Sequence, residues 1–302
     1  MDVVHPQGRL LGGRFELRGE LGRGGMGVVH RALDRALGRE VALKVVQQGF
    51  ADAESRARFE REGQLTAALR HPNIVAVHSA GEVEGRPFIA YELVAGAQPL
   101  DRVLAKLDLP ARVAMVRDVA RALGHAHANG IVHRDVKPAN VLVDDTGRPR
   151  VSDFGLATAA GLGRLTQTGE VLGTPNYMSP EQLKGDAAVG PPTDVWALGG
   201  ILYRALTDEA PFAGSSFFQL AGRVLQGDPP RPPRSINPAI PRAIEAVCLA
   251  ALRRDPAERP RDGEELARRL DEALRGGGDA PARTRAALAA LGTAAMLVVG
   301  AT

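Results

Sequence analysis

The sequence predicts an α+β protein with two lobes: a small β-rich lobe that contains one helix, followed by a large, mainly α-helical lobe. Short β-branched or alternating segments fill roughly the first ninety residues, and a helical pattern interrupts them once, at about 54–69. From about Gly96 onward the pattern turns helical. Because 44% of the 302 residues are hydrophobic, the chain can build one large core or two modest ones.

The first lobe, at about 10–94, is expected to be a sheet of strands joined by glycine-containing turns. The segments FELRGELGRG and GVVHRALD flank a glycine loop, and REVALKVV is a β-branched run. Two more strands fit the segment IVAVHSAGEVEGRPFIAYEL, which has glycines between its apolar runs. The chain then crosses to the second lobe near 92–97, and a cleft between two lobes is a usual place for a ligand site.

The second lobe, at about 97–272, contains two helices that the sequence marks clearly. The segment ARVAMVRDVARALGHAHANG is amphipathic and ends in an Asn-Gly pair typical of a helix C-cap. The segment TDVWALGGILYRAL (193–206) is apolar nearly all round yet too short to span a bilayer, so we expect a buried central helix with Thr193 or Asp194 as its cap. The proline-rich segment 227–238 is expected to be a loop.

Composition excludes several classes of protein. Cys248 is the single cysteine, so the chain has no internal disulfide framework and no multi-cysteine metal site, which fits a reducing compartment. The net charge of +3 comes without a clustered basic face and interleaved aromatic residues, so we expect no nucleic-acid partner. The first ten residues lack a basic stretch followed by an apolar one, so no secretory signal is expected.

The C-terminal segment predicts a membrane anchor. After a linker at 273–285, residues 286–302 carry no charge, and this length is just at the short limit for a membrane span. Arginines lie on its N-terminal side, so the positive-inside rule would keep residues 1–285 in the cytoplasm, attached to the inner face of the plasma membrane. The alternative is a buried or alanine-rich surface helix.

The glycine loop is a candidate phosphate-binding element. Its G-x-G-x-x-G spacing is formed by Gly22, Gly24 and Gly27. Dinucleotide-binding folds share this spacing, and Glu40 even lies about where a ribose ligand would be sought, but in those folds the turn opens a helix. Here the following residues continue as a strand, which favours a β-turn-β flap over phosphates. A hairpin without a ligand is the alternative, and the missing GxxxxGK[ST] motif excludes a P-loop NTPase.

Lys44 lies in the buried-strand pattern VALKVV, where an unpaired ammonium group would be costly, so it requires an anion. The helix at about 54–69 offers one. At helical spacing Glu62 falls within the apolar stripe of Phe59, Leu65 and Leu69. We therefore predict that Lys44 meets Glu62; the alternative places Lys44 at a strand edge and Glu62 in solvent.

Five motifs occur in the order and spacing of the protein kinase signature set: GRGGMG, VALK, HRDVKPAN, DFG (153–155) and SPE (179–181). Over roughly 10–272 the chain resembles bacterial Ser/Thr protein kinases of the eukaryotic type, especially membrane-anchored receptor kinases. The resemblance implies the bilobal protein kinase fold and transfer of the γ-phosphate of ATP to Ser or Thr hydroxyls of protein substrates.

The resemblance also implies roles for residues of the catalytic loop. Asp135 would orient the substrate hydroxyl and accept its proton, and Lys137 would contact the γ-phosphate. Asn140 and Asp153 would bind Mg²⁺ or Mn²⁺, for which oxygen ligands are suitable. His133 is expected to be a packing residue rather than a catalytic one.

The ATP contacts implied by the resemblance come mostly from the first lobe. Lys44 would hold the α- and β-phosphates while paired with Glu62, and the backbone after Glu92 would meet adenine. The full set of nucleotide-binding residues is Gly22, Gly24, Gly27, Val29, Ala42, Lys44, Glu92 and Val94. Tyr91 occupies the gatekeeper position, where its bulk would narrow the pocket behind adenine.

Regulation is implied by the segment between DFG and SPE. Its Thr166 and Thr168 resemble the autophosphorylation pair of bacterial receptor kinases, and a phosphate there could order the loop against Arg134. Such phosphorylation in trans would involve a homodimer. The resemblance further implies that Glu181 pairs with Arg259 and that Asp194 anchors the catalytic loop.

Two other classes of protein compete with this interpretation. A pseudokinase scaffold would bind ATP or partners without transfer, but its usual mark is loss of the lysine or of one of the two aspartates, and none is lost here. A nicotinamide-dependent oxidoreductase rests on the glycines alone, and protection by NAD rather than by Mg-ATP in a thermal shift would distinguish it.

Overall fold

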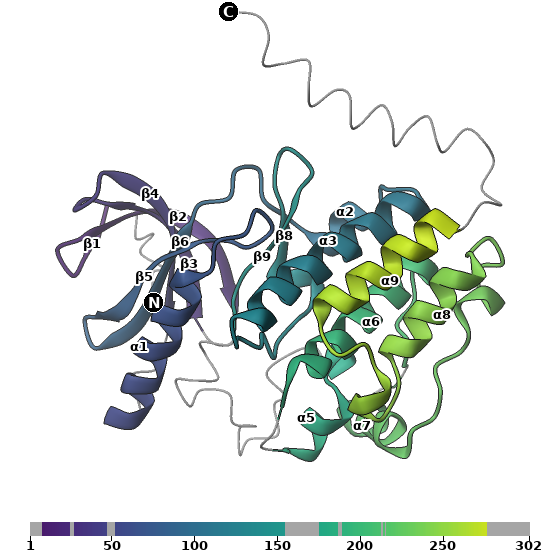
Figure 1. Ribbon diagram of the computed structural model, residues 1–302. Coiled ribbons are helices and arrows are strands. Elements are labelled where there is room, and N and C mark those ends of the chain that lie inside the picture. The colour runs from purple at the N-terminus through teal and green to yellow at the C-terminus, as the bar shows by residue number, and fades with distance from the viewer. Residues whose placement is uncertain are drawn as a thin grey trace, which may run out of the picture.

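The computed structural model describes residues 8–24, 27–46, 52–154, 175–186, 189–212, 214 and 216–276. They form two lobes, with a curled sheet and one long helix on the left of Figure 1 and a group of helices on the right. The α+β arrangement predicted from the sequence is confirmed. Thr166, Thr168 and the segment 286–302 lie outside the described residues.

The first lobe is a six-stranded antiparallel sheet in the order β1-β2-β3-β4-β6-β5. Its strands are β1 (Leu10–Leu11), β2 (Phe15–Gly24), β3 (Gly27–Asp34), β4 (Arg39–Val46), β5 (Val77–Val83) and β6 (Arg86–Glu92). Because β2 and β3 are consecutive antiparallel neighbours, the glycine loop joins two strands and opens no helix. This excludes the dinucleotide-binding arrangement that the glycine spacing alone allows.

Strand register divides the residues of this sheet between two faces. Val29 lies opposite Lys44, and Ala42 lies opposite Tyr91, so these four side chains share one face. The alternate residues form a separate core on the other face, in which Phe15 packs edge-on against Phe88. Lys44 therefore lies within a buried strand, but its side chain is on the face of the sheet that faces the second lobe.

Helix α1 (Ala53–Ala68) confirms the helix predicted at about 54–69, and the Asp52 side chain caps it by accepting from the Ser55 amide at 2.7 Å. Its buried side differs from the predicted stripe. Phe59 is fully buried, but Leu65 is 48% exposed. The helix approaches β5 through Gly63, where a Cβ would lie 2.8 Å from Ala80 Cβ, and this close approach turns Leu65 outward.

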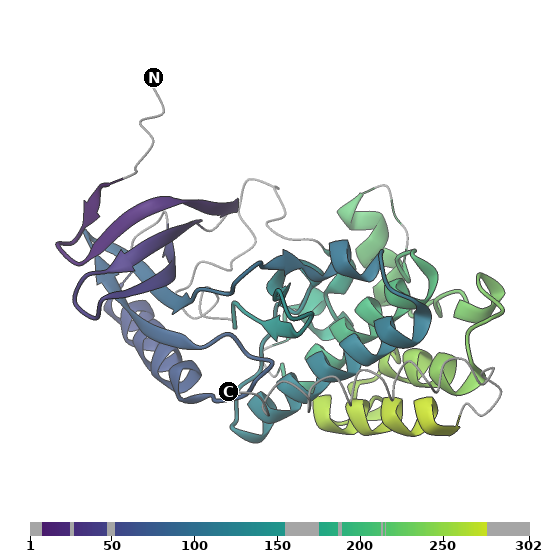
Figure 2. The same cartoon turned by 90° about the horizontal axis from the view of Figure 1, so that it is seen from above.

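The second lobe begins with a small sheet at the boundary and continues as helices around α6. The sheet contains β7 (Gln98–Pro99), β8 (Val141–Val143) and β9 (Pro149–Val151). The helices are α2 (Leu100–Leu104), α3 (Leu109–Ala128), α5 (Pro180–Lys184), α6 (Pro191–Thr207), α7 (Phe217–Gln226), α8 (Arg242–Ala251) and α9 (Gly263–Gly276). Helices α3 and α9 lie side by side in both views (Figure 1, Figure 2). Within the described ranges, no helix is long and apolar enough to cross a membrane.

Helix α6 is buried as predicted, but it begins earlier than the sequence suggested. Gly190 is its N-cap residue and Pro191 opens its first turn, so Thr193 and Asp194 lie inside the helix and neither is its cap. A proline at the first helical position is pre-organised for this conformation. The side chains of Thr193 and Asp194 are free of the capping role and bond to other segments instead. The proline-rich segment after α7 contains a short 3₁₀ helix at Pro233–Ser235.

An ion pair between Glu181 and Arg259 is buried in this lobe. The Arg259 guanidinium donates to both Glu181 carboxylate oxygens, at 2.8 and 2.9 Å, and to three backbone carbonyls. Thr193 Oγ1 donates to the same carboxylate at 2.7 Å. Burial alone would raise the pKa of Glu181, but these hydrogen bonds and the Arg259 charge outweigh it and lower the pKa from 4.5 to about 2.

Replacing Glu181 with Gln should lower the free energy of unfolding by about 3 to 5 kcal/mol at pH 7, because Arg259 keeps its buried charge and loses its counterion. The depressed pKa makes this contribution fully present above about pH 4.5, and it is lost as the pH falls toward about 2. Urea denaturation of both proteins across this range should show the difference shrinking with acidity.

The matched control is Glu272→Gln, which removes the same charge from an exposed i,i+4 pair with Arg268. It should change the free energy of unfolding by less than about 0.5 kcal/mol at any pH. A Glu181→Gln difference that stays constant between about pH 7 and about pH 2.5 would contradict the assignment of the low pKa to this pair.

Candidate active site

The loop between α3 and β8 carries the predicted catalytic residues, and a buried carboxylate on α6 holds its backbone. Asp194 Oδ2 accepts from the His133 amide and Asp194 Oδ1 from the Arg134 amide, both at 2.8 Å. His127 Nδ1 accepts from the Gly263 amide at 3.2 Å, so His127 Nε2 carries the proton and donates to Asp194 Oδ2 at 2.8 Å. The expectation that Asp194 anchors this loop is therefore confirmed.

The same loop is also tied to α5. Gln182 Nε2 donates to the Arg134 carbonyl oxygen at 2.7 Å, while Gln182 Oε1 accepts from the Ser179 amide. Arg134 has a backbone φ of +65°, which residues other than glycine rarely adopt. Bonds from α5 and α6 to its carbonyl and amide keep this strained residue in place, immediately before Asp135.

Asp135, Lys137 and Asn140 form a compact polar cluster. Lys137 Nζ donates to both Asp135 carboxylate oxygens, at 2.7 and 3.0 Å. Asn140 Nδ2 donates to the Asp135 carbonyl at 2.8 Å and to its Oδ2 at 3.1 Å, which leaves Asn140 Oδ1 for another partner. The Asp135 side chain remains 44% exposed, so a substrate hydroxyl can reach its carboxylate.

His133 is fully buried and has no access to a substrate. Its Nδ1 accepts from the Asp135 amide at 3.3 Å, and its Nε2 donates to the Ser152 carbonyl at 2.8 Å. Its ring packs on Phe154, with centroids 4.7 Å apart. The expected packing role fits these contacts, because His133 connects the loop to the segment that carries Asp153.

Lys44 is paired with Asp153, not with Glu62 as the sequence suggested. Lys44 Nζ lies 2.8 Å from Asp153 Oδ1, and the described residues form no ion pair between Lys44 and Glu62. The physical reason is the side of α1 that packs on the sheet: its close contact with β5 is made at Gly63, and the neighbouring Glu62 is half-buried. The need of Lys44 for an anion was correctly inferred, but the anion comes from the other lobe.

Asp153 receives a second hydrogen bond on the same oxygen, from Tyr91 Oη at 3.0 Å. Burial alone would raise the pKa of Asp153, but the Lys44 charge and the hydrogen bonds from Lys44 and Tyr91 lower it below its usual value. Asp153 also has φ +59°. A charged carboxylate in a strained backbone conformation is typical of a functional site.

The flap and strands of the first lobe complete the site. A Cβ on Gly22 or Gly24 would meet no described atom within 4 Å, so protein packing does not require these glycines, and a ligand can approach the backbone there. A Cβ on Gly27 would lie 2.3 Å from the Val45 carbonyl oxygen, so this glycine is required by packing.

The remaining predicted nucleotide residues lie on or beside the same face. Val29 and Ala42 are half-buried, and Val94 is buried with Tyr91 in one cluster. The Glu92 carboxylate is held by both Arg150 guanidinium NH2 groups, at 2.7 and 2.8 Å, which fixes its side chain against the segment that carries Arg150. Leu142 of β8 packs on this cluster from the second lobe and was not predicted from the sequence.

The side chains around Asp153 fit a divalent cation bound together with a nucleotide. Asp153 and Asn140 supply hard oxygen atoms, which suit Mg²⁺. Among the described residues, no group of three or more His, Cys, Asp or Glu residues converges as a ready-made metal cage. A cation held by few protein ligands must complete its shell with phosphate oxygens and water, as Mg²⁺ commonly does.

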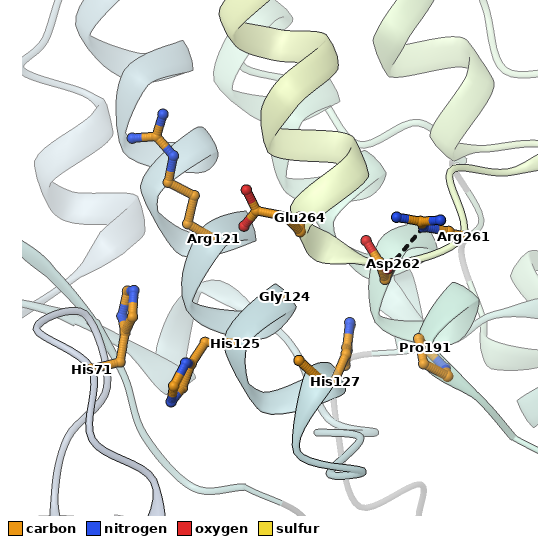
Figure 3. Close-up of a pocket in the computed structure, with 10 residues that line it drawn as sticks. His71, Arg121, Gly124, His125, His127, Pro191, Arg261, Asp262 and Glu264 are labelled. Carbon is orange, nitrogen blue, oxygen red and sulfur yellow. Dashed lines mark hydrogen bonds and ion pairs between the residues drawn. The ribbon is translucent and has the colours of Figure 1, made fainter.

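A separate hollow of about 580 Å³ lies where α3, α9 and the turn after α1 meet (Figure 3). Its lining includes His71, His125 and His127. Several of its polar groups are already engaged, because Arg261 pairs with Asp262 and His127 bonds to Asp194. Asp135 and Asp153 do not line it, so it is distinct from the cluster described above.

Comparison with known proteins agrees with this geometry. The sequence profile of the protein kinase domain matches residues 15–267. The chain belongs to the protein kinase family. The catalytic loop, the DFG segment and the lysine strand described above are therefore those of a kinase domain.

Curated relatives of this kinase domain are bacterial Ser/Thr protein kinases. The DNA damage-responsive kinase RqkA of Deinococcus radiodurans is 43% identical over 267 residues, covering 86% of this chain and 39% of RqkA. PrkC of Bacillus subtilis is 38% identical, covering 86% of this chain and 40% of PrkC. The chain thus spans about two-fifths of the length of these relatives. The crystal structure of the Mycobacterium tuberculosis PknI kinase domain matches with a TM-score of 0.70 and 28% identity, covering 88% of this chain and 98% of that one.

The sequence predicted Tyr91 as the gatekeeper but not its hydrogen bond to Asp153, and it did not predict the contact of Gln182 with the catalytic loop. The hydroxyl of Tyr91 signals that a polar partner is needed in an otherwise apolar strand, but nothing local identifies Asp153 as that partner. Gln182 gave no signal, because a glutamine in the first turn of a helix usually serves the cap, as it also does here.

Changing Asp194 to Asn should lower the free energy of unfolding by about 2 to 3 kcal/mol, because the amide NH2 would face a buried backbone N–H donor. The catalytic loop should lose its geometry as well, so phosphotransfer should fall by at least ~10²-fold. Urea denaturation and a phosphotransfer assay with Mg-ATP measure the two effects.

Asp208→Asn, at the C-cap of the same helix, is the matched control, because this carboxylate is 72% exposed and pairs with Arg112 at the surface. Its stability should change by less than about 1 kcal/mol. If Asp194→Asn and Asp208→Asn change stability and phosphotransfer by the same amounts, Asp194 does not hold the loop.

Proposed function

We propose that this protein is a Mg²⁺- and ATP-dependent Ser/Thr kinase that phosphorylates protein substrates. The observation that carries the proposal is a pair of linked polar groups: Lys44 bonds to Asp153, and Lys137 and Asn140 bond to Asp135. A backbone hydrogen bond from Ser152 to Asn140 joins the two groups. The names of the relatives support Ser/Thr specificity. A lysine two residues after the catalytic aspartate agrees with it, as the resemblance implied.

Each residue of the cluster has a distinct task in this proposal. Asp135 orients the substrate hydroxyl and accepts its proton, and its partial exposure allows the hydroxyl to approach. Lys137, already beside Asp135, places a positive charge where the transferred phosphate carries its negative charge. Lys44 exchanges its partner Asp153 for nucleotide phosphates, which its partly exposed position permits.

Asp153 and Asn140 would hold Mg²⁺, or Mn²⁺ in its place. When bound, the cation neutralises charge on the phosphates and draws them into position. The flap over Gly22 and Gly24 would cover these phosphates with backbone N–H groups. A pseudokinase scaffold is less well supported, because the residues whose loss marks such proteins are all present and hydrogen-bonded within the site.

Regulation by autophosphorylation is part of the proposal. Thr166 and Thr168 lie in the segment that follows Asp153, and Arg134 lies next to the catalytic Asp135 in sequence. A phosphate in this segment would add about −1.5 to −2 charge, which an arginine can bind and so order the segment. Transfer between two copies of the chain, as a transient homodimer, would supply the phosphate.

The purified full-length chain should incorporate label from γ-labelled ATP and Mg²⁺, and Asp135→Asn should reduce this by at least ~10²-fold, because the residue that orients the hydroxyl is lost. Phosphosite mapping by mass spectrometry should place the label on Thr166 or Thr168. Asp118→Asn, the same change in a surface carboxylate paired with arginines, should incorporate label like the wild type.

Absence of label in the wild type despite ATP binding would favour the scaffold. Label on other residues, with Thr166 and Thr168 unmodified, would remove the regulatory part of the proposal while keeping the activity.

We also propose that residues 286–302 attach the kinase domain to the inner face of the plasma membrane. The uncharged run and the arginines before it support this. After cell fractionation the full chain should sediment with membranes and resist a high-salt wash, whereas a chain ending at residue 285 should remain in the supernatant. A full chain that stays in the supernatant without detergent would exclude the anchor.

A further inference from the structure

The ring of Tyr91 is fixed within the first lobe, while its hydroxyl reaches the metal-binding region. Tyr91 is 6% exposed and belongs to an apolar cluster with Phe59, Val77 and Ile89. It lies on β6 opposite Ala42 of β4 on one side and opposite Val77 of β5 on the other. Strands on both sides therefore determine where the hydroxyl points.

The hydroxyl has no packing function. A phenylalanine would fill the same cluster with the same ring, without the cost of burying a polar group. The hydroxyl is instead used as a donor to Asp153 Oδ1, at 3.0 Å, across the boundary between the lobes. The side chain thus combines an apolar body held by the sheet with a polar tip on a carboxylate of the other lobe.

The donors that the described residues supply to Asp153 both go to the same oxygen. Lys44 Nζ and Tyr91 Oη bond to Oδ1, at 2.8 and 3.0 Å, and together occupy its two lone pairs. This arrangement orients the carboxylate plane and leaves Oδ2 as the oxygen open to a cation. The two donors differ in charge. The Lys44 ammonium group is attracted to nucleotide phosphates as well as to Asp153, whereas the neutral phenol of Tyr91 is not attracted to phosphates.

We propose that Tyr91 is a positioning residue for the metal site: its hydroxyl holds Asp153 Oδ1 so that Oδ2 is presented to the divalent cation, also when Lys44 has moved to the nucleotide. The proposal rests on the proposed function, because it assumes that Asp153 binds the cation of a metal–ATP complex. Groups that orient a metal ligand commonly change metal affinity by about 10- to 100-fold when they are removed.

The test is Tyr91→Phe in the full-length chain, with Mn²⁺ as the probe. Free Mn²⁺ is followed by electron paramagnetic resonance during titration of the protein saturated with a non-hydrolysable ATP analogue. The variant should bind Mn²⁺ at least ~10-fold more weakly than the wild type. In phosphotransfer assays the Mg²⁺ concentration for half-maximal rate should rise by a similar factor, while kcat at saturating Mg²⁺ changes by less than about 3-fold.

Tyr203→Phe is the matched control, because this buried tyrosine donates to the Arg231 carbonyl, outside the site. Its Mn²⁺ affinity should equal that of the wild type. Tyr91→Met, which keeps an apolar side chain in the cluster but has no ring, should share the metal defect of Tyr91→Phe. Thermal denaturation without metal checks that each variant is folded.

Unchanged or tighter Mn²⁺ binding by a folded Tyr91→Phe protein would overturn the positioning role and leave the proposed function intact. An equal loss in Tyr203→Phe would overturn it as well, because the effect would not be specific to the site. Failure of the wild type to bind Mn²⁺ with the nucleotide analogue would instead overturn the proposed function, and this inference with it.

Discussion

The arrangement of the catalytic residues depends on the buried carboxylate of Asp194. A loop cannot hold an unusual backbone conformation by itself, and Arg134, at φ +65°, needs outside support. Asp194 supplies it from a rigid helix by accepting the amides of His133 and Arg134. Because charged acceptors form the stronger hydrogen bonds, one carboxylate can fix the direction of two peptide groups. Asp135 follows directly and takes its position from them.

The two main ion pairs serve different purposes, and burial distinguishes them. Arg259 and Glu181 are shielded from water and surrounded by further hydrogen bonds, so the pair cannot exchange partners without a large desolvation cost. Lys44 and Asp153 keep side-chain exposures of 15% and 27%. Such a pair can open when phosphates and a cation offer equivalent partners. The first pair holds the second lobe together, and the second is available for chemistry.

Strand alternation links the nucleotide region to the metal region. Val29, Ala42, Lys44 and Tyr91 share one face because of strand register, and that face meets Leu142 and Asp153 of the second lobe. A shift of one residue in the register would turn Lys44 into the core on the other face. Gly22 and Gly24 of the flap leave their backbone open to a ligand, whereas Gly27 lets the flap pack closely on β4. The arrangement of these side chains thus follows from a period of two residues in three neighbouring strands.

Local sequence patterns were sufficient to predict the two lobes, the strands, the buried helix α6 and the residues of the signature motifs. Alternation, helical periodicity and motif spacing can be recognised within short stretches of chain. These patterns also predicted that Lys44 needs an anion, but they did not identify the residue that supplies it. The contacts of Asp153 with Lys44 and Tyr91 join residues 109 and 62 positions apart. Packing between the lobes and the close approach of α1 to β5 at Gly63 decided these contacts. Asp194 likewise bonds to the loop rather than capping its own helix. Such choices depend on distances between segments that a linear pattern does not encode.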